Sequence, residues 1–238
     1  GFIRLQKPLA HCRALSYFCS TFLSGVSEVE QSFTWAYSCS NDMSSLKSYP
    51  VPSAKQSSGQ ALLTTRSISL IGAECTGKSS LGLALAEHLP GVYIPEILRD
   101  FCMQKGRTPQ IDEQALILHQ QIKEEELALL FAKQKSLSWV VSDSSPLMTA
   151  LYSVLYFQDA RLLNFALAHQ RRYTLTFLLD IDLPWVADGI QRDSPSMQAK
   201  VHNQLLHLLK QEKISYTLIS GQARLQTALE ITKALLLS

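Results

Sequence analysis

The chain of 238 residues is 46% apolar, so it can bury a sizeable core as a domain of ordinary size. Its formal net charge of +2 gives no overall field that would attract nucleic acid or an anionic membrane, and we expect neither as a partner. No run approaches the roughly 18 apolar residues that a membrane span needs. The five cysteines lack metal-ligand or disulfide-framework spacing, which favours the reducing cytoplasm.

The first 66 residues differ in composition from the rest of the chain. They hold six Lys and Arg against three acidic residues, and the stretch SYPVPSAKQSSGQ at 48–60 is rich in Ser and Pro. We interpret 1–66 as a disordered or non-native N-terminal extension and linker, in which 1–42 is a fragment end or an over-extended reading frame before Met43. The alternative is a signal or transit peptide, because basic residues precede a short apolar patch.

From residue 67 onwards, short apolar runs alternate with helical repeats. Five runs bounded by turn residues predict strands at 68–71, 91–96, 138–143, 173–182 and 214–221. A leucine repeat after the first strand predicts a helix, and further helices are predicted at 97–104, 111–135, 146–157, 159–170, 196–212 and 222–237. This order predicts an α/β domain at 67–238: a doubly wound, mostly parallel five-stranded sheet with helices on both faces. Ligands are then expected at the carboxyl ends of the strands.

The loop after the first predicted strand reads GAECTGKSS and satisfies the pattern GxxxxGK[ST]. Gly72 and Gly77 permit backbone angles and close approaches that a Cβ would obstruct, and the loop N–H groups would then hold phosphate oxygens. Lys78 would reach the β and γ phosphates, and Ser79 would ligate Mg²⁺. The sequence therefore predicts a P-loop NTPase that binds ATP and Mg²⁺. The predicted nucleotide-binding residues are Gly72, Glu74, Cys75, Thr76, Gly77, Lys78, Ser79 and Ser80.

The run WVVSD supplies a candidate for the second metal-side residue. Asp143 is the first charged residue after Trp139, Val140 and Val141, at the end of a predicted strand. We expect it to hold the Mg²⁺ shell through water. The alternative is a helix N-cap, because Pro146 stands where a helix would begin.

The residues after two other strands point to the phosphate acceptor. In PEILRD, Glu96 and Arg99 lie three residues apart, so they can share a face directed at the ligand edge. The carboxylate would accept hydrogen bonds from sugar hydroxyls, and the arginine would steady a phosphate or a carboxylate. A capped helix with a surface ion pair is the alternative, and on position alone the two interpretations are equal.

The polar stretch DIDLPWVADGIQRDSPSM follows the fourth predicted strand and reads as a loop. Kinases neutralise the charge that develops during transfer with a basic residue on a lid over the triphosphate, and we expect Arg192 in that role. The alternative is a solvated charge at a helix start. Trp185 would stack on a ring of the acceptor or close the edge of the core.

Four segments together resemble a known family. In this order and spacing, GAECTGKSSLGLALAEHL, YIPEILRDF, SDSSPLMTALYSVLYF and YTLTFLLDIDLPWVADGIQRD are similar to the ribosylnicotinamide kinase domain of NadR-type proteins and, more broadly, to NadR-like P-loop ATPases and kinases. The resemblance covers about 67–238. It implies phosphoryl transfer from ATP-Mg²⁺ to the 5′-hydroxyl of a ribonucleoside such as nicotinamide riboside, within NAD metabolism. It also implies substrate or catalytic roles for Glu96, Arg99, Trp185, Asp188 and Arg192.

Two departures from the family pattern keep other functions open. Where kinase members commonly read D-T-D, this chain reads Asp143-Ser144-Ser145, and 1–66 carries no adenylyltransferase signature. Besides a nucleoside kinase in which Lys78, Glu96, Asp143 and Arg192 are catalytic, we retain two alternatives. One is an ATP-binding regulatory module with weak ATPase activity, and the other is a different small-molecule kinase. Nothing in the sequence indicates a homo-oligomer.

Overall fold

The computed structural model describes residues 64–185 and 194–237. Within these ranges the strands form one parallel sheet in the order β2-β3-β1-β4-β5. Its members are β1 (Arg66–Ile71), β2 (Gly91–Ile94), β3 (Trp139–Asp143), β4 (Leu175–Leu179) and β5 (Thr217–Ile219). Leu70 pairs with Asp143 of β3 and with Phe177 of β4, so the central strands end at a common edge. Side chains that follow these strands are therefore brought together there.

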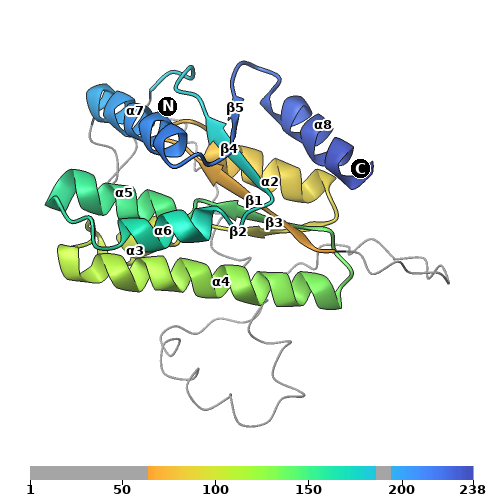
Figure 1. Cartoon of the computed structure of the whole chain (residues 1–238), viewed down its shortest axis with the longest axis horizontal. Helices are drawn as coiled ribbons and strands as arrows, with labels where there is room; N and C mark the ends of the chain where they lie inside the picture. The colour runs from red at the N-terminus through yellow and green to blue at the C-terminus, as the bar shows by residue number, and fades with distance from the viewer. Residues whose placement is uncertain (1–63, 186–193, 238) are drawn as a thin grey trace, which may run out of the picture. The chain divides into compact units, whose positions relative to one another are not determined.

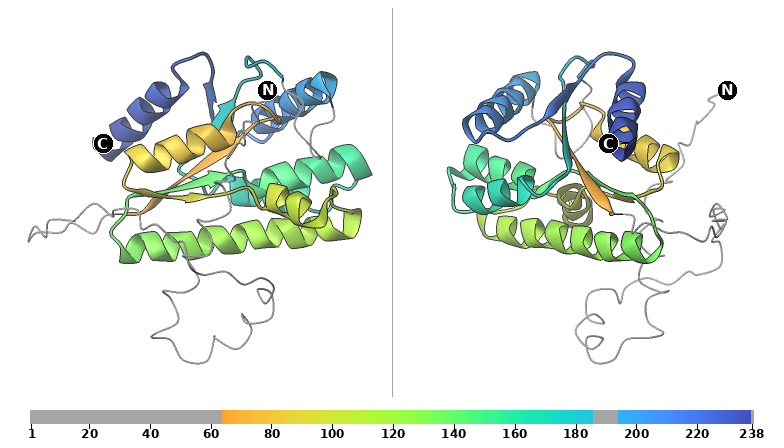
Figure 2. Two further views of the ribbon diagram at one scale, coloured as in Figure 1. Left: turned by 180° about the vertical axis from the view of Figure 1, so that it is seen from behind. Right: turned by 45° about the vertical axis from the view of Figure 1, so that its right-hand side comes forward.

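Helices cover both faces of the sheet, as Figures 1 and 2 show. They are α2 (Lys78–His88), α3 (Ile97–Lys105), the 3-10 helix η2 (Ile111–Glu113), α4 (Gln114–Gln134), α5 (Pro146–Phe157), α6 (Leu163–Gln170), α7 (Pro195–Gln211) and α8 (Arg224–Leu237). The right-hand view of Figure 2 places α2 and α8 on one side of the strands, with α5, α6 and α7 on the other.

The two faces form separate apolar cores, because side chains alternate along each strand. On one face, Ile68 and Leu70 of β1 pack with Leu81 and Leu85 of α2 and with Ala228 of α8. The opposite core joins β1 and β4 to α4, α5, α6 and α7 through Ile71, Leu178, Leu118, Leu147, Ala166 and Leu205. Every one of these side chains is at most 5% exposed. Both cores hold the helices against β1, from which the GAECTGKSS loop departs.

The predicted α/β architecture is confirmed, and the structure refines several bounds. The helix predicted at 159–170 begins only at Leu163, because Asp159 accepts a hydrogen bond from the backbone N–H of Arg161 at 3.0 Å and forms a local turn instead. The strands predicted at 173–182 and 214–221 shorten to β4 and β5. The predicted lid around Arg192 and nearly all of the proposed extension lie outside the described residues. In the described part of the chain, no helix is both long and apolar enough to cross a membrane.

Candidate functional site

The loop between β1 and α2 has the backbone that its glycines allow. Gly72 has a φ of 150°, and a Cβ there would lie 3.0 Å from the Leu179 carbonyl oxygen and 3.2 Å from Thr76 Oγ1. Gly77 has a φ of 80° and stands at the N-cap of α2, where it offers no side chain to the first helical N–H groups. The result is a tight loop that leads into an uncapped helix N-terminus, which is the geometry that holds phosphate oxygens.

The Lys78 side chain lies against this loop. It is buried, and its Nζ donates to the carbonyl oxygens of Gly72 at 3.0 Å and Ala73 at 2.8 Å. Thr76 Oγ1 donates to the same Ala73 oxygen at 2.8 Å. The ammonium group is therefore fixed beside the loop, where it would meet the anion that the N–H groups bind.

Asp143 ends β3 with its carboxylate almost fully buried, at 1% exposure. Its Oδ2 accepts a hydrogen bond from the Tyr93 hydroxyl at 2.8 Å, whereas its Oδ1 has no hydrogen-bond partner among the described residues. Because buried carboxylate oxygens are normally paired, Oδ1 is available to bind a ligand at the end of β3. The alternative role as a helix cap is not the one observed, since Ser145 is the N-cap of α5.

The residues present fit a magnesium ion bound together with phosphate. Mg²⁺ typically takes one or two protein oxygens, substrate phosphates and waters, and the half-buried Ser79 together with Asp143 Oδ1 can supply the protein part. In residues 64–185 and 194–237 there is no group of three or more His, Cys, Asp or Glu that could hold a metal. The site would therefore depend on the nucleotide for most of its ligands.

Glu96 and Arg99 meet the loop at the same edge. Glu96 is the N-cap residue of α3, its side chain is 11% exposed, and it forms an ion pair with Arg99 Nη2 at 3.2 Å. Burial raises the pKa of Glu96, and the Asp143 charge raises it further, while the charges of Lys78 and Arg99 lower it. The strands that precede these residues end at a common edge, where Leu70 pairs with Asp143 and Ile94 with Ser142, and the charges of Lys78 and Asp143 act on Glu96 there. The ion pair between Glu96 and Arg99 is observed, whereas their roles in binding or catalysis stay predictions.

The raised pKa of Glu96 predicts a pH-dependent cost in stability. Because its pKa in the folded protein exceeds the unfolded value, stability falls as the pH rises through the folded pKa, and each pKa unit costs about 1.4 kcal/mol. We expect Glu96→Gln to have a higher melting temperature than the wild type at pH 8, with the difference vanishing towards pH 4. Thermal denaturation from pH 4 to 8, with the exposed Glu126→Gln as control, measures this. If the melting temperatures of wild type and Glu96→Gln change with pH in parallel, the pKa of Glu96 is not raised in the folded protein.

Arg224, at the start of α8, ties three loops together and was not predicted from the sequence. Its guanidinium donates to the Thr76 carbonyl oxygen and pairs with Asp182, and it also donates to the carbonyl oxygens of Asp180 at 3.2 Å and Gly221 at 3.2 Å. The residue is only 9% exposed. The GAECTGKSS loop is thereby fixed to the segments that follow β4 and β5.

We expect Arg224→Met to lower the free energy of unfolding by about 2 kcal/mol, since the Thr76 carbonyl oxygen and Asp182 Oδ1 lose the donor that Arg224 supplies. The matched control is Arg171→Met, which breaks a more exposed ion pair with Glu212 at 2.7 Å and should cost less than about 1 kcal/mol. Urea denaturation of both variants decides this. Equal losses would show that the buried hydrogen bonds of Arg224 contribute no more to stability than an exposed ion pair.

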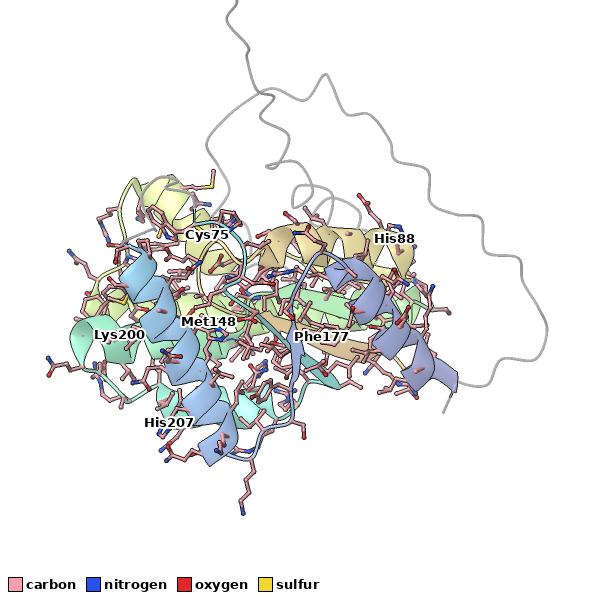
Figure 3. All side chains as sticks on the ribbon, turned by 90° about the horizontal axis from the view of Figure 1, so that it is seen from above. Cys75, His88, Met148, Phe177, Lys200 and His207 are labelled. Carbon is pink, nitrogen blue, oxygen red and sulfur yellow. The ribbon has the colours of Figure 1, made fainter. Side chains whose placement is uncertain are left out.

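The remaining predicted residues vary in how far the structure describes them. Ser80 is exposed, and Cys75 has a φ of 59°. The Glu74 carbonyl oxygen accepts a hydrogen bond from Gln198 of α7 at 2.7 Å. Trp185 is half-buried, while Asp188 and Arg192 lie outside the described residues. Figure 3 places Cys75 at the end of α2 opposite His88, with Lys200 and His207 along α7.

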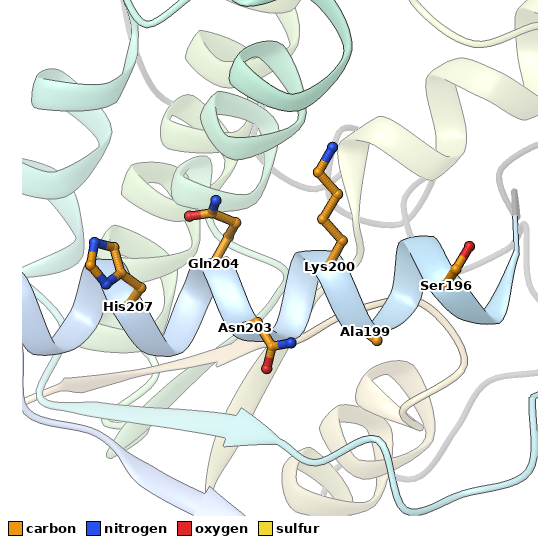
Figure 4. A pocket seen from close by; sticks show the side chains of 6 residues that line it. All are labelled: Ser196, Ala199, Lys200, Asn203, Gln204 and His207. Carbon is orange, nitrogen blue, oxygen red and sulfur yellow. The ribbon is translucent and has the colours of Figure 1, made fainter.

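A separate open hollow of about 620 Å³ runs along α7 (Figure 4). It is lined by Ser196, Ala199, Lys200, Asn203, Gln204 and His207. All six belong to one helix, and Lys200, Gln204 and His207 project from the same side of it. None of the predicted site residues within 64–185 and 194–237 lines this hollow, so it is distinct from the cluster around the loop.

The AAA domain family AAA_28 matches residues 67–224, which is more than half of the chain. The chain belongs to this family. The match begins within β1 and ends at Arg224, so it spans Glu96, Asp143, the loop and the arginine that bonds to the loop at Thr76. A P-loop domain of this kind implies nucleotide binding.

Solved structures show the same fold. NadR in complex with NR has a TM-score of 0.56, and NadR in complex with NAD and AMP-PNP has one of 0.60; each is 16% identical and covers 72% of this chain. The chain spans about half the length of these structures, 51% and 49%. Thymidylate kinase from Candida albicans has a TM-score of 0.52 at 18% identity, covering 72% of this chain and 92% of that one. No curated protein matches the sequence. This AAA_28 member therefore has a P-loop kinase-like fold.

Proposed function

We propose that residues 67–238 form a nucleoside kinase that transfers a phosphoryl group from ATP to the 5′-hydroxyl of a small ribonucleoside such as nicotinamide riboside. The observation that carries the proposal is the convergence of Lys78, Asp143 and the Glu96–Arg99 pair at one sheet edge. The NadR structures, one with NR and one with AMP-PNP, support a donor and an acceptor site in this fold.

On the donor side, the loop N–H groups and Lys78 would hold the phosphates. Phosphoryl transfer demands mostly positioning and charge stabilisation, which fixed donors supply without reorganisation. Ser79 and Asp143 would hold Mg²⁺, which, when bound, neutralises charge on the phosphates. Lys78 is already held in place by its hydrogen bonds to the loop carbonyls.

On the acceptor side, Glu96 is the better proton acceptor of the two carboxylates. Its pKa is raised by burial, which brings it closer to the pH at which a general base works best. Asp143 Oδ2 already accepts a hydrogen bond from Tyr93, and Oδ1 would bind the metal ion. Arg99 would orient Glu96 through their ion pair and contact the acceptor.

We further propose that the segment before α7 acts as the lid. Arg192 would neutralise charge during transfer, while Asp188 and Trp185 would contact the acceptor. The support for Trp185 is its half-buried position immediately before this segment. Trp185→Ala should raise KM for the nucleoside several-fold with little change in KM for ATP, because base–aromatic contacts typically contribute about 1 kcal/mol or more. A panel of initial-rate measurements with each substrate varied in turn checks this, and equal changes in both KM values would contradict it.

The direct test is ADP release measured over a panel of nucleosides, with the phosphorylated product identified by mass spectrometry. We expect release to be stimulated by one or more ribonucleosides and the product to gain one phosphoryl group. Hydrolysis that no acceptor alters would instead support a regulatory module with weak ATPase activity.

A different acceptor is the second candidate, and Ser145 favours it. This residue stands where family kinases commonly carry a second acid, and its hydroxyl donates to the buried Gln170 at 2.7 Å. The chain therefore lacks one carboxylate that the nicotinamide riboside interpretation expects. Deoxynucleosides, nucleoside monophosphates and coenzyme A precursors belong in the same panel.

A further inference from the structure

Tyr93 occupies an unusual place in the cluster. It lies on β2, in register with Val141 of β3, and its hydroxyl donates to Asp143 Oδ2 at 2.8 Å. Burial and the Asp143 charge raise the pKa of Tyr93, while the neighbouring Ser79 hydroxyl lowers it. The phenol thus donates a hydrogen bond to one proposed metal ligand, Asp143, and lies near the other.

The first turns of α2 are shaped to admit this ring. A Cβ at Gly82 would lie 2.7 Å from Tyr93 Cε2, a distance that real Cβ atoms do not show. Gly82 follows Ser79 by three residues, so both lie on the helix face that meets β2. Glycine in a helix interior costs stability relative to alanine, and here it gives space to the tyrosine.

The two oxygens of the Asp143 carboxylate are therefore used differently. Tyr93 bonds Oδ2, while Oδ1 is buried without a partner among the described residues. Fixing one oxygen restrains rotation of the carboxylate and directs the other. We propose that Tyr93 is a positioning residue of the metal site, which holds the Asp143 carboxylate in the orientation in which Oδ1 binds the Mg²⁺ of the nucleotide complex. This inference rests on the proposed function for its choice of metal and nucleotide.

The test compares the nucleotide affinity of wild type and Tyr93→Phe by calorimetry with AMP-PNP, in EDTA and in Mg²⁺. The phenylalanine keeps the ring beside Gly82 and removes only the hydroxyl. We expect the gain in affinity on adding Mg²⁺ to shrink about tenfold or more, because removing a hydrogen-bond partner of a metal-binding carboxylate typically lowers metal affinity about 10- to 100-fold. Affinity in EDTA should change less than about twofold. Gly82→Ala, which displaces the ring but keeps the hydroxyl, should reduce the Mg²⁺ gain as well.

Two controls separate positioning from general stability. Tyr173→Phe removes another tyrosine hydroxyl, which donates to the buried carboxylate of Glu125 at 2.7 and 2.8 Å, and should lower the melting temperature without changing the Mg²⁺ gain. In an Asp143→Asn background, Tyr93→Phe should have no further effect on that gain.

The outcomes are distinguishable. An unchanged Mg²⁺ gain in Tyr93→Phe overturns the inference, as does a wild-type protein that shows no gain at all. A wild-type protein that binds AMP-PNP more tightly with Mg²⁺ but phosphorylates no acceptor overturns the proposed kinase activity. In that case, a loss confined to Tyr93→Phe and Gly82→Ala would still support the role of Tyr93.

Discussion

Lys78→Ala should lower kcat by about three orders of magnitude, because it removes the one ammonium group held at the phosphate loop among the described residues. The group is buried and already fixed by two loop carbonyls, so it needs little reorganisation to meet a γ-phosphoryl group. The effect should fall on kcat more than on KM for ATP, because charge develops during transfer and the ground state retains the loop N–H groups.

Steady-state kinetics with the stimulating nucleoside measures this effect, and Lys210→Ala, at the exposed far end of α7, is the matched control. Transfer by Lys78→Ala within tenfold of the wild type would refute the proposed chemistry.

A stability measurement adds a second readout. Since the Lys78 charge lowers the pKa of Glu96, its loss leaves that carboxylate with less compensation. The double variant Lys78→Ala, Glu96→Gln should then be more stable than the two single effects added together.

Asp143→Asn should lower kcat by about two to three orders of magnitude and raise the Mg²⁺ concentration for half-maximal rate at least about tenfold. Asparagine matches the shape of aspartate and can still accept the hydrogen bond from Tyr93, so the change removes charge and leaves the packing of β3 intact. The loss should therefore appear in the metal dependence and not in the fold.

Rates titrated with MgCl₂ at saturating ATP measure this dependence, and the exposed Asp112→Asn serves as control. A melting temperature close to that of the wild type would confirm that the fold is kept. If Asp143→Asn keeps the wild-type Mg²⁺ curve, the unpaired Oδ1 does not face the metal and the assignment fails.

The sequence predicts the sheet and the loop well because both depend on local patterns. A short run such as Trp139–Asp143, led by apolar residues and bounded by turn residues, favours a buried strand, and GxxxxGK[ST] prescribes its own backbone through Gly72 and Gly77. The residues that were missed make contacts over long chain separations. Arg224 reads as an ordinary charge at a helix start, yet its partner Thr76 lies 148 residues away.

Tyr93 was missed for a related reason. A tyrosine in a short apolar strand is ordinarily part of the core, and only the register of β2 against β3 directs its hydroxyl to Asp143. A glycine inside the repeat LGLALA was the available signal, because Gly82 makes sense only if another group approaches α2 closely. Glu96 and Arg99, in contrast, were found from the sequence, because their spacing predicts an ion pair. The sequence does not predict the burial that raises the pKa of Glu96.

The hydrogen bond from Gln198 to the Glu74 carbonyl oxygen has a consequence for regulation. It joins the first turn of α7 to the phosphate loop. Gln198→Ala would release the loop from α7 at this point. If binding of one ligand strengthened this contact, linkage would make the contact favour that ligand in return, and the variant would remove the effect.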